Sequence, residues 1–177
     1  MVERREFSRL LELSELVHGS LPFDIRAEPQ EREAVARRLE IPAIARLRAE
    51  GVVEGAGSGV VRVRGRLEAD VTQQCVVTLE PVPNTVTARF ERLFVRDGRA
   101  VSAVVVDPEA PDLEPLPAAG LDIGEIVVEE LALALEPYPR GPGADAFLAR
   151  YAGGGEPGEG EDESGPFARL ARARPKG

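Results

Sequence analysis

The sequence predicts an α+β fold: one antiparallel, strongly bent sheet built on a long β-hairpin, covered by two helices, with a disordered C-terminal tail. Residues from Val61 to Leu79 follow a period of two, with apolar side chains at most odd positions and charged ones at the even positions of the first half. One segment before this run and one after it carry helix-start signals, and residues 152–166 are rich in glycine and acidic residues. The chain has 177 residues, 43% of them apolar, which suffices for one core. We therefore expect one α+β domain over residues 1–151 and a disordered acidic linker and basic tail over residues 152–177.

The N-terminal region predicts short strands and one helix. Residues 7–13 alternate weakly, and residues 21–26 read as a short edge strand because they contain a proline. A helix is expected from Pro29 to Leu39, with proline in its first turn, acids in front and arginines behind. Residues 43–54 are ambiguous, and we favour a strand at their end.

The region from Val61 onward gives the strongest secondary-structure signal. Its odd positions are mostly apolar, whereas Arg62, Arg64 and Arg66 occupy even positions, so one face is apolar and the other charged. A strand this long usually bends, and Gly65 is the expected place. Residues 80–84, with two prolines, are expected to close the hairpin.

The second half of the predicted hairpin is followed by an irregular stretch and a helix. The return strand should run from Thr85 to Val95. Residues 97–120 are rich in proline and read as irregular, with a possible strand at 101–106. A helix is predicted from Leu121 to Leu135, where Asp122 can cap the first turn and Glu125 can complete a capping box.

Charge and cysteine content limit the functional classes. The formal net charge of −9 disfavours non-specific nucleic-acid binding by the body as a whole. One cysteine excludes an internal disulfide, and the first thirty residues contain no apolar run typical of a signal peptide or membrane span. We expect a cytoplasmic protein with no membrane partner.

Three segments carry a family resemblance. They are Val71 to Pro83, the stretch Leu121-Asp-Ile-Gly-Glu with the following Glu129 to Pro139, and the tail Pro166-Phe-Ala-Arg-Leu170. Together, and in this order, they resemble the YceD family, named for accumulation of the large ribosomal RNA subunit. The resemblance implies a non-catalytic factor that supports accumulation of large-subunit (23S) ribosomal RNA and biogenesis of the large ribosomal subunit. It brings no catalytic residues.

The single cysteine departs from a pattern common in that family. Many relatives carry Cys-x-x-Cys at this hairpin turn, which suggests a metal knuckle in those members, but here the turn reads Cys75-Val-Val-Thr78. A hydroxyl cannot replace a thiolate in a structural zinc site, so we expect no metal and no cofactor. Cys75 reads as a buried strand residue, and we disfavour a nucleophilic dyad with His18 because no activating environment flanks either residue.

Two groups of residues are candidates for RNA or partner binding. Arg62, Arg64 and Arg66 form a stripe that could follow a phosphate backbone, although nearby acids could equally make it an ordinary solvated face. The tail combines a short apolar pair with unopposed cations and reads either as a binding segment or as an inert solubilising end. Its candidate residues are Phe167, Arg169, Leu170, Arg172 and Arg174.

The sequence contains no enzyme signature and suggests no small-molecule substrate. Glu125, Glu129, Glu130 and Glu136 are explained by helix capping and a wet helix face. The expected mechanism is binding of large-subunit ribosomal RNA or a basic ribosomal protein. The alternative is a protein-only adaptor or chaperone of a basic partner with no direct RNA contact, and a domain unconnected with ribosomes is a third possibility.

Overall fold

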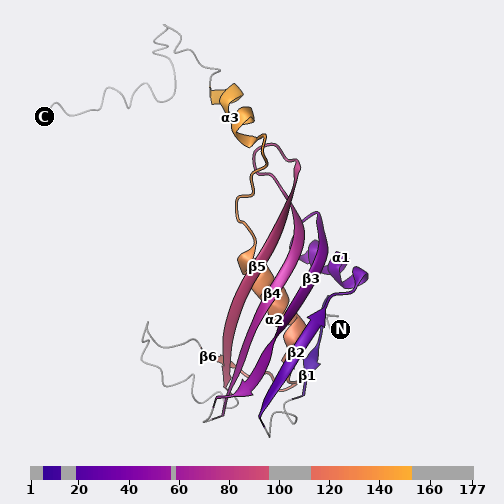
Figure 1. Cartoon of the computed structure of the whole chain (residues 1–177), viewed down its shortest axis with the longest axis vertical. Helices are drawn as coiled ribbons and strands as arrows, with labels where there is room; N and C mark the ends of the chain where they lie inside the picture. The colour runs from indigo at the N-terminus through magenta and orange to yellow at the C-terminus, as the bar shows by residue number, and fades with distance from the viewer. Residues whose placement is uncertain (1–5, 13–18, 57–58, 96–112, 153–177) are drawn as a thin grey trace, which may run out of the picture.

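The computed structural model describes residues 6–12, 19–56, 59–95 and 113–152, which form two sheets and three helices (Figure 1). The larger sheet has the strand order β2-β3-β4-β5-β6, and β1 pairs with β7 in a separate two-stranded sheet. The strands are β1 (Leu10–Leu11), β2 (Ser20–Arg26), β3 (Ala43–Gly55), β4 (Val60–Gln74), β5 (Pro81–Val95), β6 (Leu113–Pro115) and β7 (Leu121–Asp122). The helices are α1 (Pro29–Arg38), α2 (Ile123–Ala134) and α3 (Ala144–Ala152).

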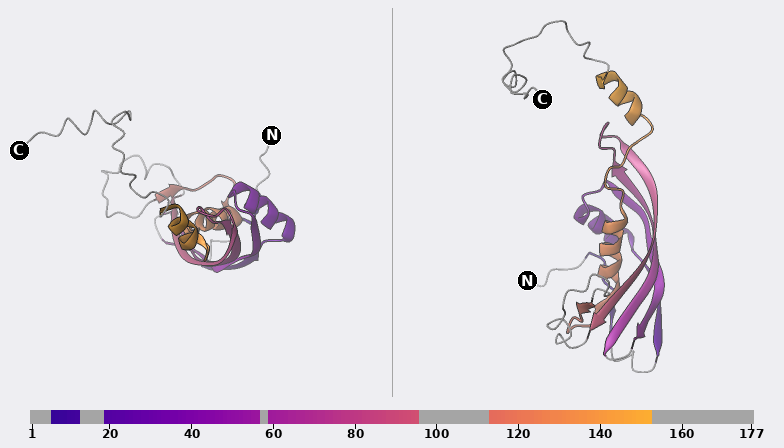
Figure 2. Two further views of the ribbon diagram at one scale, coloured as in Figure 1. Left: turned by 90° about the horizontal axis from the view of Figure 1, so that it is seen from above. Right: turned by 90° about the vertical axis from the view of Figure 1, so that its left-hand side faces the viewer.

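The predicted mixed α+β class and the mostly antiparallel sheet are confirmed. Strands β2 to β5 pair antiparallel in sequence order, but β6 pairs parallel with the end of β5, which the sequence did not predict. Seen from above, the sheet curves around α2, and α2 runs along its inner face (Figure 2). Helix α1 packs beside β3. We call the side that faces α2 the inner face and the opposite side the outer face.

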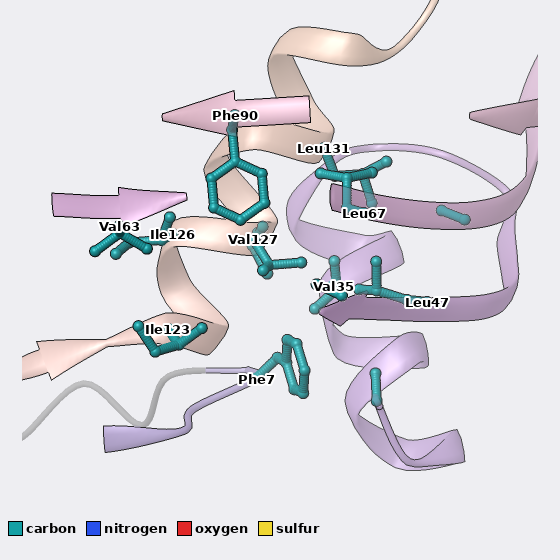
Figure 3. Close-up of a cluster of buried hydrophobic side chains, with 14 of the residues drawn as sticks. Phe7, Val35, Leu47, Val63, Leu67, Phe90, Ile123, Ile126, Val127 and Leu131 are labelled. Atoms are coloured by element: carbon teal, nitrogen blue, oxygen red, sulfur yellow. The ribbon is translucent and has the colours of Figure 1, made fainter. Parts of the chain in front are cut away.

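The core lies between the inner face, α2, α1 and the N-terminal segment (Figure 3). Alternate residues of β3, β4 and β5 point inward, whereas α2 contributes residues at helical spacing. The largest fully buried side chains include Phe7, Val35, Leu47, Val63, Leu67, Ile123, Val127 and Leu131.

The hairpin turn lies earlier in the chain than predicted. Strand β4 ends at Gln74, residues 75–80 form the turn, and β5 already begins at Pro81, so the predicted turn over residues 80–84 is wrong. Pro81 and Pro83 are tolerated in β5 because an edge strand can leave their side of the backbone unpaired. Leu79, predicted on the apolar face, lies in the turn with a φ of 62° and is exposed.

Gly65 has a packing role that the sequence did not reveal. It pairs across the sheet with Gly51, and the rings of Phe23 and Phe90 lie over this glycine pair. A Cβ on Gly51 would stand 2.1 Å from the Arg64 carbonyl oxygen, and a Cβ on Gly65 would stand 2.5 Å from the Phe90 ring. The two aromatic rings therefore fill space on the inner face that side chains at these positions would take.

The helix predictions are close to the observed bounds. Glu28 and Glu31 form a capping box at the start of α1, and the Asp122 side chain accepts hydrogen bonds from the backbone of Gly124 and Glu125 at the start of α2. The Glu125 carboxylate, which the sequence pattern linked to the cap, accepts hydrogen bonds of 2.6 and 2.9 Å from Arg38.

Other segments differ from expectation or lie outside the described residues. Among the described residues 7–12 of the weakly alternating N-terminal stretch, only Leu10–Leu11 forms a strand, and residues 43–55 form one continuous strand, β3. Helix α3 was not predicted. The possible strand at 101–106 falls outside the part of the chain that the structure describes. Of the linker and tail predicted over residues 152–177, Ala152 is the last residue of α3, and the rest falls outside the described part.

Candidate functional site

The structure places Arg62, Arg64 and Arg66 side by side on the outer face. They come from β4, at alternate positions, and their side chains are half exposed, as the period of two predicts. Their neighbours across the sheet on β3 are Glu54, Val52 and Glu50. The sequence therefore located this stripe correctly in the fold.

Each of these arginines already has a carboxylate partner. Arg62 lies 3.7 Å from Glu54 and 3.3 Å from Glu91, while Arg64 donates a 2.8 Å hydrogen bond to Glu54. Arg66 forms a 3.1 Å salt bridge with Glu68 of its own strand. The guanidinium groups are thus neutralised locally, which weakens the field that would attract phosphate.

Salt bridges continue along the outer face beyond the three arginines. Arg46 binds Asp70 at 2.9 Å, and the hydrogen bond from Arg46 lowers the pKa of that carboxyl, helped by one from Thr85. Arg48 lies 3.2 Å from Glu68. The sheet register puts seven arginines and six carboxylates on this face: Arg26, Arg46, Arg48, Arg62, Arg64, Arg66 and Arg89, with Asp24, Glu50, Glu54, Glu68, Asp70 and Glu91. The outer face is therefore strongly charged but close to neutral.

The tail candidates lie outside the described part of the chain. Phe167, Arg169, Leu170, Arg172 and Arg174 all follow residue 152, where the described residues end. The structure neither joins them to the arginine stripe nor separates them from it, so their role stays a prediction.

A second charged feature lies at the edge of the sheet, between α2 and β5, and the sequence did not predict it. Arg92 of β5 points to the inner side, where it donates hydrogen bonds to Glu114 of β6 and Glu129 of α2. Glu114, followed by Glu129, raises the pKa of Arg92. Burial raises the pKa of the nearby Glu130, which forms no salt bridge with any described residue.

These residues line an open groove, which we call the edge groove. It has a volume of about 440 Å³ and is lined by Glu91, Arg92, Leu93, Glu114, Glu129, Glu130 and Leu133. Glu114, Glu129 and Glu130 lie on the same side as the single guanidinium of Arg92, so the groove carries excess negative charge, whereas Glu91 at its border binds Arg62 on the outer face. Leu133 is 81% exposed at its border, which adds an apolar contact. No local sequence pattern could reveal this groove, because its residues come from three elements.

Cys75 is fully buried at the hairpin turn, where its sulfur contacts the segment that follows α2. Its sulfur accepts hydrogen bonds of 3.4 Å from the backbone N–H of Thr78 and of Gly141. The Gly141 bond, followed by those from Thr78, lowers the pKa of Cys75 to about 6. Val76 N also donates to Pro139 O at 2.9 Å. The turn and residues 139–141 are thus joined by backbone and thiol contacts.

The residues at this turn do not fit a structural zinc site. Zinc needs four ligands, and Cys75 is the one thiol while Thr78 offers a hydroxyl. Within the described ranges, no group of three or more His, Cys, Asp and Glu residues is arranged to hold a metal ion. His18, the other residue of the disfavoured dyad, lies outside these ranges. Across the same described residues, every helix is too short or too polar to cross a membrane.

A comparison with protein families matches residues 63–172 to the family described as large ribosomal RNA subunit accumulation protein YceD. The chain belongs to the YceD family. The match runs from β4 through α2 and α3 and includes four of the five tail candidates, with Arg174 beyond it. Comparison with curated proteins and with solved structures gave no match. The resemblance noted in the sequence is therefore confirmed.

Proposed function

We propose that this YceD-family protein supports accumulation of large-subunit ribosomal RNA as a binding factor that catalyses no reaction. The match to the family over residues 63–172 carries the proposal, since the family's name supports this role. Charged surfaces, and not a catalytic set, dominate the described geometry, which favours binding. Ribosome biogenesis takes place where ribosomes are assembled, so we place the protein in the cytoplasm.

A basic ribosomal protein is the partner that the surface charges favour. The body has an acidic edge groove, and the arginines of the outer face are balanced by carboxylates. For single-stranded RNA, the logarithm of the binding constant falls with the logarithm of the salt concentration, with a slope of about −0.7 for each phosphate contact. A face with one excess positive charge would lose only about threefold in RNA affinity between 50 and 200 mM salt, whereas seven unopposed arginines would lose about a thousandfold.

Direct RNA binding is the second candidate. The observation that favours it is the alignment of Arg62, Arg64 and Arg66 on one exposed strand face, to which the cations of the tail would add. Under this candidate, changing the three arginines together to glutamate abolishes a steeply salt-dependent affinity for RNA. A matched control changes Arg37, Arg140 and Arg150 to glutamate, since these exposed arginines form no salt bridge with any described residue and the net charge changes equally.

Affinity purification of the tagged full chain from lysate, with and without nuclease, tests the proposed function. We expect large-subunit ribosomal proteins to be recovered in both conditions if the partner is a protein. Recovery only without nuclease would indicate RNA as the tether. Recovery of neither ribosomal protein nor ribosomal RNA, together with normal large-subunit RNA levels in a deletion strain, would refute the proposal.

A further inference from the structure

Strand β5 exposes an unpaired edge for most of its length. It pairs with β4 along all of Pro81–Val95, but β6 pairs only with Leu93–Val95 (Figure 1). Residues 81–92 therefore have no strand neighbour on that side among the described residues. Unpaired backbone groups on such an edge are available to an additional strand.

The hydrogen-bond pattern shows which residues of β5 direct their backbone outward. Cys75 N donates to Glu80 O at 2.8 Å, so this pair is hydrogen-bonded, and bonded pairs recur at every second residue of an antiparallel ladder. The odd-numbered residues of β5 therefore turn their N–H and C=O groups away from β4. Val95 agrees with this assignment, because its carbonyl accepts from Leu116 N at 2.9 Å.

The prolines of β5 fit the same assignment and leave most of the edge intact. Pro81 and Pro83 are both odd-numbered, so their missing N–H groups cost the sheet no hydrogen bond. Beyond them, the outward N–H groups of Thr85, Thr87 and Arg89, at alternate positions, have no hydrogen-bond partner within the described part of the chain. The stretch from residue 84 to residue 92 is thus a competent edge, and it leads directly into the edge groove.

Resting on the proposed function, we propose that the β5 edge binds an extended, lysine- and arginine-rich segment of a partner protein as an added strand. The backbone of that segment pairs with the outward groups of β5. Its alternate side chains reach the edge groove, where Glu129, Glu130 and Leu133 of α2 receive cationic heads and aliphatic stems. The basic character of the segment follows from the excess of carboxylates in the groove.

Charge also argues against the other occupants of this edge. A second copy of the chain, paired antiparallel through β5, would leave Glu130 of each copy without a new cation, because the one cationic residue on the inner side of residues 81–92 is Arg92, which already binds Glu114 and Glu129. RNA phosphates would meet the same carboxylates. A basic protein segment is the occupant for which both the backbone groups and the side chains find partners.

Peptide binding to the full-length protein tests the inference. The probe is a fluorescein-labelled nonapeptide in which lysine occupies every second position and threonine or valine the positions between. The control probe has glutamate in place of each lysine. The decisive variant is Thr87→Pro, which removes one outward N–H, and its matched control is Thr87→Ala. We expect the lysine probe to bind wild type and the glutamate probe not to bind. Thr87→Pro should weaken the affinity for the lysine probe about tenfold, whereas the affinity of Thr87→Ala should stay within about twofold of wild type.

A groove variant keeps the inference testable if Thr87→Pro fails to fold, which a melting curve would show. Glu130→Lys reverses the charge of a carboxylate that has no salt-bridge partner among described residues, and we expect it to weaken the lysine probe at least fivefold. Equal binding by Thr87→Pro and Thr87→Ala, or by Glu130→Lys and wild type, would overturn the inference. So would a dimer that Thr87→Pro dissociates, or binding of a fluorescein-labelled uridine decamer that Thr87→Pro weakens.

The same variants separate this inference from the proposed function. If wild type and Thr87→Pro recover equal amounts of large-subunit components from lysate, the edge inference is wrong while the proposed function stands. If wild type recovers no large-subunit components, yet Thr87→Pro and Glu130→Lys weaken its binding to the lysine probe, the proposed function is wrong and the edge inference stands.

Discussion

The glycine pair in the middle of the sheet gives the sharpest test of the fold. Gly51→Ala would place a Cβ on the inner face, 2.1 Å from the Arg64 carbonyl oxygen and 2.7 Å from Gly65 Cα. Both are backbone atoms of the neighbouring strand, so no change of rotamer can make room. The phenyl ring of Phe23, 2.6 Å away, would have to move as well.

The size of the effect follows from how little the neighbours can yield. Overpacking in a core costs typically about 1–3 kcal/mol, and a clash with backbone belongs at the upper end, so we expect Gly51→Ala to lower the free energy of unfolding by about 3 kcal/mol. For a protein of this size that corresponds to a fall in Tm of roughly 6–12 °C. Gly65→Ala meets the Phe90 ring, a side chain that can shift, and should cost about 1–2 kcal/mol.

Gly55→Ala is the matched control, because it makes the same substitution in the same strand with no atom within 4 Å of the new Cβ. It should change stability by about 0.5 kcal/mol or less, in the stabilising direction, since alanine restricts the unfolded chain. Urea denaturation followed by circular dichroism gives all three values. If Gly51→Ala came within about 0.5 kcal/mol of Gly55→Ala, the close approach of β3 and β4 at this point would be wrong.

Three further predictions concern the edge groove, the hairpin turn and the tail. Arg92→Met leaves three carboxylates facing one another, so it should lower the free energy of unfolding by about 2 kcal/mol at neutral pH. The loss should be smaller near pH 4, because the carboxylates gain protons there. An equal loss of stability at the two pH values, measured by thermal melts, would contradict this prediction. The pKa of Cys75 is about 6 in the folded protein and that of an unfolded thiol is about 8.5, so the stability of wild type relative to Cys75→Ala should rise from about pH 6 to about pH 8.5 and stay level below and above this range. A difference that does not change across this range would count against the thiol contacts. Deleting residues 153–177 should leave Tm within about 2 °C and, if the tail is a binding segment, reduce recovery of large-subunit components; a lower Tm would show that the tail belongs to the fold.

Periodicity predicted the strands of the hairpin better than it predicted their junction. The alternation of Val61 to Val71 places the correct residues in the core, because a period of two depends only on which face is buried. The turn was misplaced because Pro81 and Pro83 look like turn residues in a linear sequence. Only the register shows that both point to an open edge, where proline is harmless.

The candidate sites divide in the same way. The arginine stripe was predictable, since its members share one strand. Its partner Glu54 was not, because residues 43–54 gave no clear pattern and their pairing with β4 depends on the assembled sheet. The edge groove could not be predicted at all, because Arg92, Glu114 and Glu129 meet only after β6 returns to β5 and α2 crosses the inner face.

The long hairpin separates the two ends of the molecule. Each of β4 and β5 has 15 residues, which corresponds to a length of about 50 Å. The Cys75 turn and the start of α3 lie at one end, and the edge groove lies toward the other, beside β6 (Figure 1). A ligand that touches both regions must therefore be elongated, whereas a compact ligand can contact one region or the other. One such molecule has room for two separate compact ligands at the same time, with the hairpin as the spacer.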